Sequence, residues 1–290
     1  MSTPPYLNLP RRARRVTFAT VQGPLTGVRI DPEGQPRGTI VFVPGFTGSK
    51  EDFVAVLEPL ASRGWVVVAY DQRGQFESVG PEEETAYSLK TLARDLLEVV
   101  AHLDVAPVHV VGHSFGGLVA REAALACDGK AMASLTLLCS GPGAMPSSHR
   151  DGLGALHAAL PHVPLSTVYD VKEAADREGG WEPPSAAVER FMRHRFISNN
   201  PWAMRAKAGI LLETPDRTQE LAHLALNGFP IAVVYGPDDD AWTSDDQIAM
   251  ATAFGTRALI VPSAGHSPAA DQPEATAEVL DSLLGNSPTA

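Results

Sequence analysis

Short apolar runs rich in β-branched residues alternate with helical patterns from Thr39 onward, and this alternation limits the possible folds more than any other feature. The runs are nearly continuous in apolar residues, as expected for strands buried on both faces, and they occupy residues 39–43, 65–70, 108–111, 134–139, 230–235 and 258–261. Helical patterns at 52–62, 89–103 and 118–126 supply crossovers between them. The alternation therefore predicts an α/β protein with a mostly parallel, doubly wound sheet.

Two segments depart from this alternation. Before the first buried run, residues 15–20 and 26–30 flank a Gln-Gly-Pro turn, which predicts an antiparallel hairpin at the N-terminal edge of the sheet. Residues 141–227 show no convincing strand and contain several proline-punctuated helical stretches. We therefore expect a core made of residues 1–140 and 228–290, with a helical cap inserted at 141–227.

Composition narrows the kinds of partner. The chain has 290 residues, is 44% hydrophobic and has a formal net charge of -11, which disfavours binding to nucleic acid and to anionic membranes. The basic run at residues 11–15 is interpreted as a solvated terminal arm. The absence of an apolar leader or an 18-residue apolar stretch predicts a cytoplasmic protein, and a homo-oligomer is left open. The two cysteines, Cys127 and Cys139, are expected to be buried free thiols.

The strongest local signal is the segment Gly112–Gly116, which fits G-x-S-x-G between a predicted strand and a predicted helix. A sharp strand-to-helix turn needs glycines beside the serine, and such a turn exposes the Ser114 hydroxyl at a helix N-terminus. The alternative is an ordinary glycine-rich turn. The context favours Ser114 as a nucleophile.

A serine hydroxyl needs a base within hydrogen-bond reach, and His266 has the required position among the nine histidines. It lies in a loop just after the last predicted strand, where it would meet the serine at the carboxyl edge of the sheet. The base in turn needs a carboxylate. The loop after residues 230–235 offers three adjacent aspartates, of which we choose Asp239, then Asp240, then Asp238.

Acyl transfer also needs donors for an oxyanion, commonly two backbone N–H groups. We expect these from Phe46, in the glycine-rich loop after the first buried run, and from Phe115, next to the nucleophile. His113 and Trp242 are predicted to contact the substrate because they adjoin the nucleophile and the acidic loop. No histidine or cysteine pair has metal-ligand spacing and no nucleotide-binding loop is found, so neither metal nor cofactor is predicted.

These motifs together resemble the α/β-hydrolase superfamily over nearly the whole chain. The matching elements are the loop 44–48, the turn 71–74, the elbow at Ser114, the acid loop with Asp239, and the pair Gly265-His266, in the family's order of serine, acid and histidine. Gln75 departs from the pattern, because relatives often carry a second glycine there or at a neighbouring place, and this is expected to alter only the nearby loop.

The resemblance implies a serine hydrolase acting on an ester, thioester, lactone or amide of a small molecule, or a carbon-carbon hydrolase. Serine at the elbow argues against dehalogenase and epoxide hydrolase chemistry, for which similar proteins use aspartate. An acyltransferase or cofactor-free perhydrolase would use the same residues. A non-catalytic small-molecule receptor is the remaining class, and the intact set of Ser114, Asp239 and His266 argues against it.

Overall fold

The computed structural model describes residues 1–285 and contains one sheet of eight strands in the order β1-β2-β4-β3-β5-β6-β7-β8. β1 pairs antiparallel with β2, β2 pairs antiparallel with β4, and the other neighbours are parallel. The strands are β1 Arg14–Thr20, β2 Gly23–Ile30, β3 Gly38–Val43, β4 Trp65–Tyr70, β5 Val108–His113, β6 Ser134–Leu138, β7 Ile231–Tyr235 and β8 Leu259–Ile260. The predicted α/β fold, with its antiparallel N-terminal hairpin, is confirmed.

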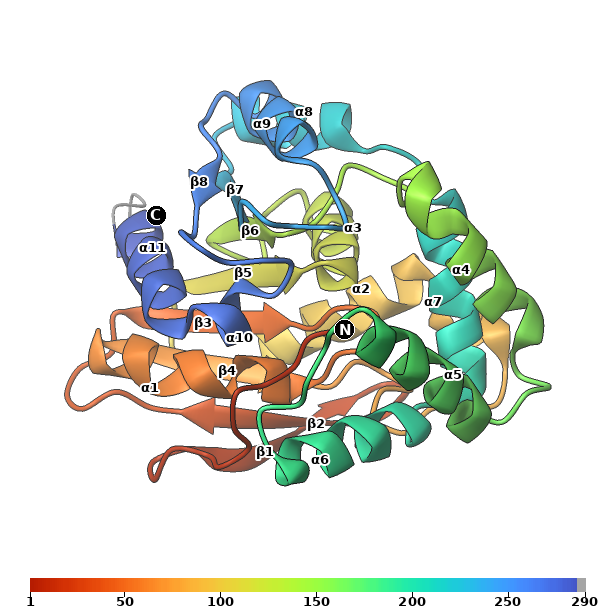
Figure 1. Ribbon diagram of the computed structural model, residues 1–290. Helices are drawn as coiled ribbons and strands as arrows, with labels where there is room; N and C mark the ends of the chain where they lie inside the picture. Colours follow the sequence, from red (N-terminus) through yellow and green to blue (C-terminus); the bar gives the residue numbers. More distant parts are fainter. Residues whose placement is uncertain (286–290) are drawn as a thin grey trace.

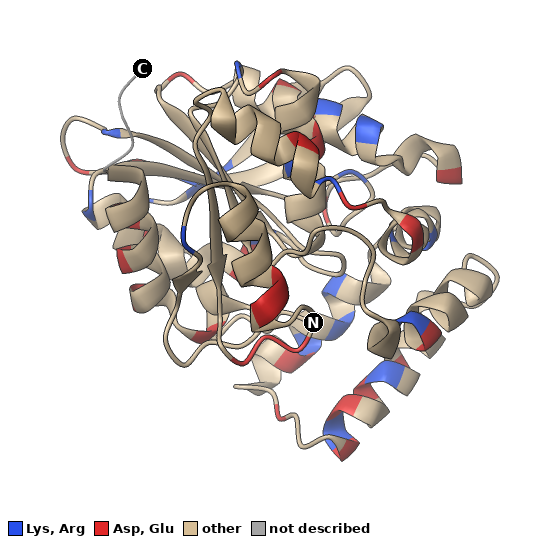
Figure 2. Cartoon of the chain, turned by 90° about the horizontal axis from the view of Figure 1, so that it is seen from above, with Lys and Arg blue, Asp and Glu red and all other residues tan. Residues whose placement is uncertain are grey.

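Helices cover both faces of the sheet (Figure 1). They are α1 Val54–Ser62, α2 Leu89–Ala101, α3 Phe115–Ala126, α4 Ser147–Ala159, α5 Leu165–Glu178, α6 Ala186–Ile197, α7 Pro201–Glu213, α8 Thr218–Leu226, α9 Ser244–Ala253, α10 Pro268–Asp271 and α11 Pro273–Gly285, with 3-10 turns η1 Lys50–Phe53 and η2 Glu84–Tyr87. One apolar cluster joins α2, α3, α8 and α9 to the sheet, and a second joins α1, α10 and α11. The charged residues lie mainly on the helices and loops (Figure 2).

Two predicted elements differ in detail. The predicted strand at 258–261 is only two residues long as β8, because it lies at the sheet edge, pairs with β7 alone and leaves Ile260 49% exposed. The predicted helix at 52–62 begins as η1 and continues as α1. The predicted burial of both thiols is correct for Cys139, whereas Cys127 is half-buried; both are free.

The basic run near the N-terminus is not a free arm. Arg12 forms an ion pair with Glu58, and Arg14 and Arg15, which lie in β1, pair with Asp31 and Glu77. These ion pairs each contribute little to stability, but they give Arg12, Arg14 and Arg15 acidic partners within the chain.

Helices α4 to α8 lie between β6 and β7 in the chain, in the segment predicted as a cap. A buried ion pair links them to the rest of the fold: Arg195 of α6 donates to Asp52 of η1 over 2.5 Å. The same guanidinium donates to the backbone oxygen of Ser2 over 2.7 Å, so the N-terminal segment is held there too.

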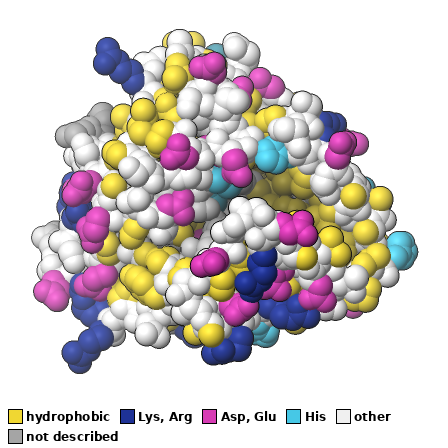
Figure 3. All heavy atoms as spheres, in the orientation of Figure 1, with side chains coloured by type: hydrophobic (Ala, Val, Ile, Leu, Met, Phe, Trp, Pro, Cys, Tyr) yellow, Lys and Arg dark blue, Asp and Glu magenta, His cyan; other side chains and the backbone are white. Residues whose placement is uncertain are grey.

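Figure 3 shows a hollow lined by hydrophobic side chains on the face drawn in Figure 1. Division of the chain into two domains stays a prediction.

Candidate active site

The nucleophile elbow is a tight turn between β5 and α3. Ser114 has φ 53° and ψ -122°, a left-handed conformation that is strained for a residue with a side chain. Steric contacts require glycine on both sides of Ser114. A β-carbon at Gly112 would lie 2.6 Å from the Gly116 oxygen, and a β-carbon at Gly116 would lie 2.2 Å from the Val43 oxygen. The turn can therefore form only with glycine at these two positions.

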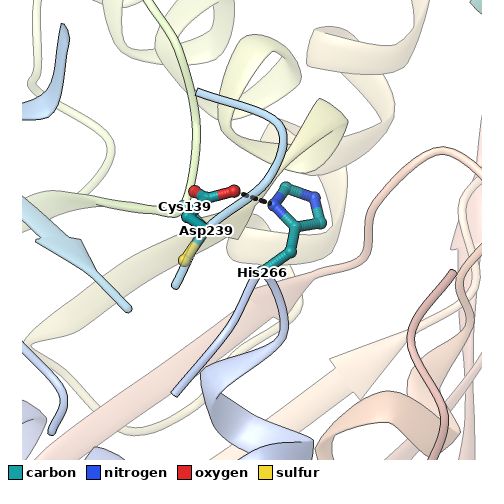
Figure 4. Close-up of side chains that lie close together, drawn as sticks. All are labelled: Cys139, Asp239 and His266. Carbon is teal, nitrogen blue, oxygen red and sulfur yellow. Dashed lines mark hydrogen bonds and ion pairs between the residues drawn. The ribbon is translucent and has the colours of Figure 1, made fainter. Parts of the chain in front are cut away.

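A continuous chain of hydrogen bonds joins the three predicted catalytic residues. His266 Nε2 lies 2.9 Å from Ser114 Oγ, and His266 Nδ1 lies 2.7 Å from Asp239 Oδ1. Figure 4 shows the Asp239 carboxylate facing the imidazole ring. An ionised carboxylate only accepts hydrogen bonds, so Nδ1 carries the proton and Nε2 is free to accept the serine proton. This is the arrangement that a general base requires.

The acidic loop after β7 separates its three aspartates clearly. The Asp239 side chain is 2% exposed, whereas Asp238 and Asp240 are exposed residues. Burial raises the pKa of Asp239, but hydrogen bonds from His266 and from the Ala241 N–H outweigh burial and bring the pKa below its ordinary value. Asp239 is thus ionised where it faces the imidazole.

Cys139 lies next to this pair, at the end of β6 (Figure 4). One ligand atom each from Cys139, Asp239 and His266 lies within 4.8 Å of the others, which is close enough for a shared metal ion. Burial, followed by the charge of Asp239, raises the pKa of the Cys139 thiol well above its ordinary value. A metal ion here would have to displace the thiol proton, and the hydrogen bond between Asp239 and His266 already accounts for the approach of these two residues.

The two expected oxyanion donors lie on neighbouring segments, one at the start of α3 and one in the loop after β3. Phe115 is the first residue of α3, so its N–H has no partner within the helix. Phe46 lies in the loop after β3, where a β-carbon added at Gly45 would be 3.2 Å from Ser114 Cβ. Phe46 and Ser114 both line the same cavity. The assignment of both N–H groups as oxyanion donors stays a prediction.

His113 supports the loop that holds the base. Its Nε2 lies 2.7 Å from the His266 backbone oxygen, and because a carbonyl only accepts, Nε2 carries the proton. Burial lowers the pKa of His113 to about 3, so the ring is neutral near pH 7. His113 also lines the cavity, which leaves the predicted substrate contact open.

The two buried histidines should lower the free energy of unfolding as the pH falls from 6.5 towards 4. Burial lowers the pKa of His109 to about 4 and that of His113 to about 3, from 6.5, so in this range the unfolded chain binds the protons. Each histidine should contribute up to about 1.4 kcal/mol per pH unit. Denaturant unfolding at several pH values measures this, and His109→Gln should remove the contribution of one ring from the slope. The buried Asp71, whose pKa is raised to about 7, acts in the opposite direction in both proteins, because the folded chain keeps a proton that the unfolded chain releases. An unchanged slope in His109→Gln would contradict the burial of the His109 ring as a neutral group.

Trp242 lies behind the acid loop. It is 2% exposed and its ring centroid lies 6.1 Å from that of His266. It packs so closely over Gly141 that a β-carbon there would be 1.9 Å from its Nε1. Trp242 therefore supports the loop with Asp239 from behind. It is not among the described residues that line the cavity, and its contact with the substrate stays a prediction.

A cavity of about 720 Å³ opens at Ser114 and His266. Its outer wall comes from the helices between β6 and β7, mainly α4 and α5, and its inner wall comes from the loops after β3 and β5. Met1 and Ser2 also line it, and the Ser2 hydroxyl lies 2.7 Å from that of Ser267, close to the base. The sequence contains no local signal for this role of the N-terminal residues, which depends on long-range contacts.

The sequence profile of the alpha/beta hydrolase family matches residues 40–279, so the chain belongs to this family. A proline iminopeptidase of Lactobacillus delbrueckii subsp. lactis is 29% identical over 61% of this chain and 60% of its own length. A putative carbamate hydrolase of Caulobacter vibrioides is 35% identical over 39% of this chain and 40% of its own. The structure of a hydrolase from Pseudomonas aeruginosa PA01 superposes with a TM-score of 0.74 at 24% identity, covering 94% of this chain and 98% of that one.

The chain spans about three fifths of the length of the first of these curated relatives. The family assignment rests on the profile match, and the solved structure, at 24% identity, supports the fold alone. In residues 1–285, no helix is both long and apolar enough to cross a membrane.

Proposed function

We propose that this chain is a serine hydrolase that cleaves a carboxylic ester, thioester or lactone of a small molecule through an acyl-enzyme. The observation that supports this most directly is the hydrogen-bond chain from Ser114 through His266 to Asp239, with distances of 2.9 and 2.7 Å. The Ser114 end of this series of hydrogen bonds lies in an apolar cavity able to hold a small acyl compound. The site has a nucleophile, a base and a binding space in contact.

The proposed reaction has two halves. His266 Nε2 takes the Ser114 proton as Oγ attacks the carbonyl carbon, and the N–H groups of Phe46 and Phe115 stabilise the oxyanion. The imidazolium, stabilised by Asp239, then gives its proton to the leaving group, leaving an acyl-serine. In the second half His266 deprotonates a water that attacks the acyl carbon, and the acid product leaves with Ser114 regenerated.

Amide or carbamate hydrolysis is the second candidate, favoured by the names of the relatives. The same residues would act, because amide cleavage differs mainly in protonation of the leaving nitrogen by His266. An acyltransferase or perhydrolase would replace the water by an alcohol or peroxide, and a carbon-carbon hydrolase would use a carbon leaving group. A receptor would bind its ligand without turnover.

Pre-steady-state hydrolysis of p-nitrophenyl butyrate tests the proposal. We expect a burst of p-nitrophenol equal to the enzyme concentration, followed by a slower steady state as water releases the acyl group. Proline p-nitroanilide, assayed in parallel, tests the peptidase candidate. Faster turnover of the anilide would favour it, and absence of turnover of both compounds by folded protein would contradict a serine hydrolase and favour a receptor.

The compound that accepts the acyl group from Ser114, water or another nucleophile, is identified in a separate assay. Products of butyryl ester cleavage are analysed in the presence of methanol or hydrogen peroxide, with butyric acid as the expected main product. A predominance of methyl butyrate or perbutyric acid at low acceptor concentration would instead identify the chain as a transferase or perhydrolase.

A further inference from the structure

The cavity wall formed by α4 and α5 is mainly apolar. From α4 and α5 it receives Leu153, Leu156 and Val168, and further apolar side chains come from Phe196 and Leu211. Among the lining residues in the described chain, the only carboxylate is Asp240, and the two amines are those of Lys172 and the Met1 N-terminus. Burial lowers the pKa of the Met1 amine, which favours its neutral form. Lys172 forms an ion pair with Asp176 one turn later in α5, which compensates its charge.

We infer that the acyl group of the substrate is a neutral apolar chain that lies against α4, and that Gly152 sets the length that fits. This inference rests on the proposed serine hydrolase function. An apolar wall gains free energy with each methylene removed from water, whereas a charged acyl group would lose its hydration without a matching partner. The wall thus selects for chain length.

Gly152 leaves space in this wall. It lines the cavity, and a β-carbon built at this position would meet no atom within 4 Å. A larger side chain there can therefore enter the cavity without moving its neighbours, and replacement of a helical glycine also favours the helix. Gly154 provides a matched control, because it lies in the same helix with equally open space but is outside the lining set.

The test measures kcat/KM for acetyl, butyryl, hexanoyl, octanoyl and decanoyl p-nitrophenyl esters. In the unmodified enzyme we expect a rise of about 4-fold per methylene until the wall is filled. Gly152→Leu should lower the ratio of decanoyl to butyryl kcat/KM by about 10-fold or more, since the added side chain takes the space of several methylenes. Gly154→Leu should keep the original ratio.

An unchanged ratio in Gly152→Leu, or a rate that falls with chain length in the unmodified enzyme, would overturn this inference. Turnover of the butyryl ester by both variants would show that the proposed hydrolase function is intact in that case. No turnover of any ester by the unmodified enzyme would instead count against the hydrolase itself, so the two failures are distinguishable.

A second, independent observation concerns Gln75, the position at which the sequence departs from the family pattern. Its side chain is 1% exposed, and its Nε2 donates to the backbone oxygens of Gly45 over 2.8 Å and of Phe46 over 2.9 Å. Its Oε1 accepts from the Gln72 N–H over 3.2 Å. Gln72 Nε2 in turn donates to the Pro44 oxygen over 2.7 Å. Two buried glutamines thus hold three consecutive carbonyls of the loop after β3.

We propose that Gln75 is a positioning residue for the oxyanion donor at Phe46. The Gly45 carbonyl and the Phe46 N–H belong to one planar trans peptide and point in opposite directions. Fixing the carbonyl towards Gln75 therefore fixes the N–H away from it. The Gly48 N–H also donates to the Gly45 oxygen, over 3.2 Å, so removal of Gln75 loosens this peptide without freeing it completely.

Gln75→Leu keeps most of the side-chain volume but removes both donors. We expect kcat to fall by about 10- to 100-fold with KM changed by less than about 3-fold, because the oxyanion exists only after attack. Affinity for butyl boronic acid, whose adduct carries the tetrahedral oxygen, should fall by a similar factor. Gln247→Leu, at another fully buried glutamine, is the control for loss of a buried amide and should keep kcat and boronate affinity.

Unchanged kcat and boronate affinity in folded Gln75→Leu would overturn the positioning role while the hydrolase burst persists. If that variant does not fold, Gln75→Asn, which retains an amide with shorter reach, is measured in its place. An intermediate loss in kcat with constant KM would support the positioning role of Gln75. Values of kcat and KM equal to those of the unmodified enzyme would overturn it.

Discussion

Ser114→Ala should reduce turnover of p-nitrophenyl butyrate by about 10⁶-fold, the largest effect of any single substitution, because no other nucleophile lies against His266 Nε2. The thermal midpoint should change little. Alanine keeps the β-carbon, so the strain at φ 53° is the same, and the Ser114 side chain makes no capping bond to α3. Steady-state rates and thermal unfolding measure the two effects together.

Ser263→Ala is the matched control for this substitution. Ser263 also has a positive φ, 57°, but lies in an exposed loop, so loss of its hydroxyl tests the same backbone strain without the nucleophile. We expect its turnover to match that of the unmodified enzyme. Loss of less than about 100-fold in Ser114→Ala would mean that the chain has a second route to turnover without this serine, and would contradict its role as the sole nucleophile.

Asp239→Asn should lower kcat by about 10⁴-fold. The asparagine amide can donate to His266 Nδ1, which would place the imidazole proton on Nε2 and leave that atom unable to accept the serine proton. The side chain is nearly isosteric, so the loop after β7 should keep its shape. Steady-state kinetics with the butyryl ester measure the loss.

Two neighbouring substitutions make this prediction specific to Asp239. Asp238→Asn, at an exposed position of the same loop, should leave kcat within about 3-fold, since surface changes of this kind have small effects. Asp240→Asn alters a residue at the cavity and can change KM. A larger loss of kcat in Asp240→Asn than in Asp239→Asn would show that the orienting carboxylate has been misassigned.

The buried strands and the elbow could be predicted because their causes are local in the sequence. Continuous apolar runs indicate strands buried on both faces, and the glycines around Ser114 are required by contacts within the same turn. His266 and the aspartate loop could be predicted from topology, because loops after parallel strands meet at one edge of the sheet. The choice among the three aspartates needed burial, which separates Asp239 from its neighbours.

Other features depend on contacts between distant segments, which no local pattern contains. In the sequence, Gln75 is visible only as a position where the family pattern has glycine. Its hydrogen bonds to Gly45 and Phe46 form because the turn after β4 lies against the loop after β3 in the fold. Trp242 adjoins the acid loop in sequence, yet its ring turns inward over Gly141. The pairing of Arg195 with Asp52 likewise spans 143 residues.

The most direct test of a nucleophilic Ser114 is covalent labelling with a fluorophosphonate probe, followed by intact mass measurement and peptide mapping. We predict one adduct per chain, located on Ser114, which disappears in Ser114→Ala and forms much more slowly in Asp239→Asn. An adduct on another residue, or no adduct in folded unmodified protein, would contradict the assignment of this serine as the nucleophile.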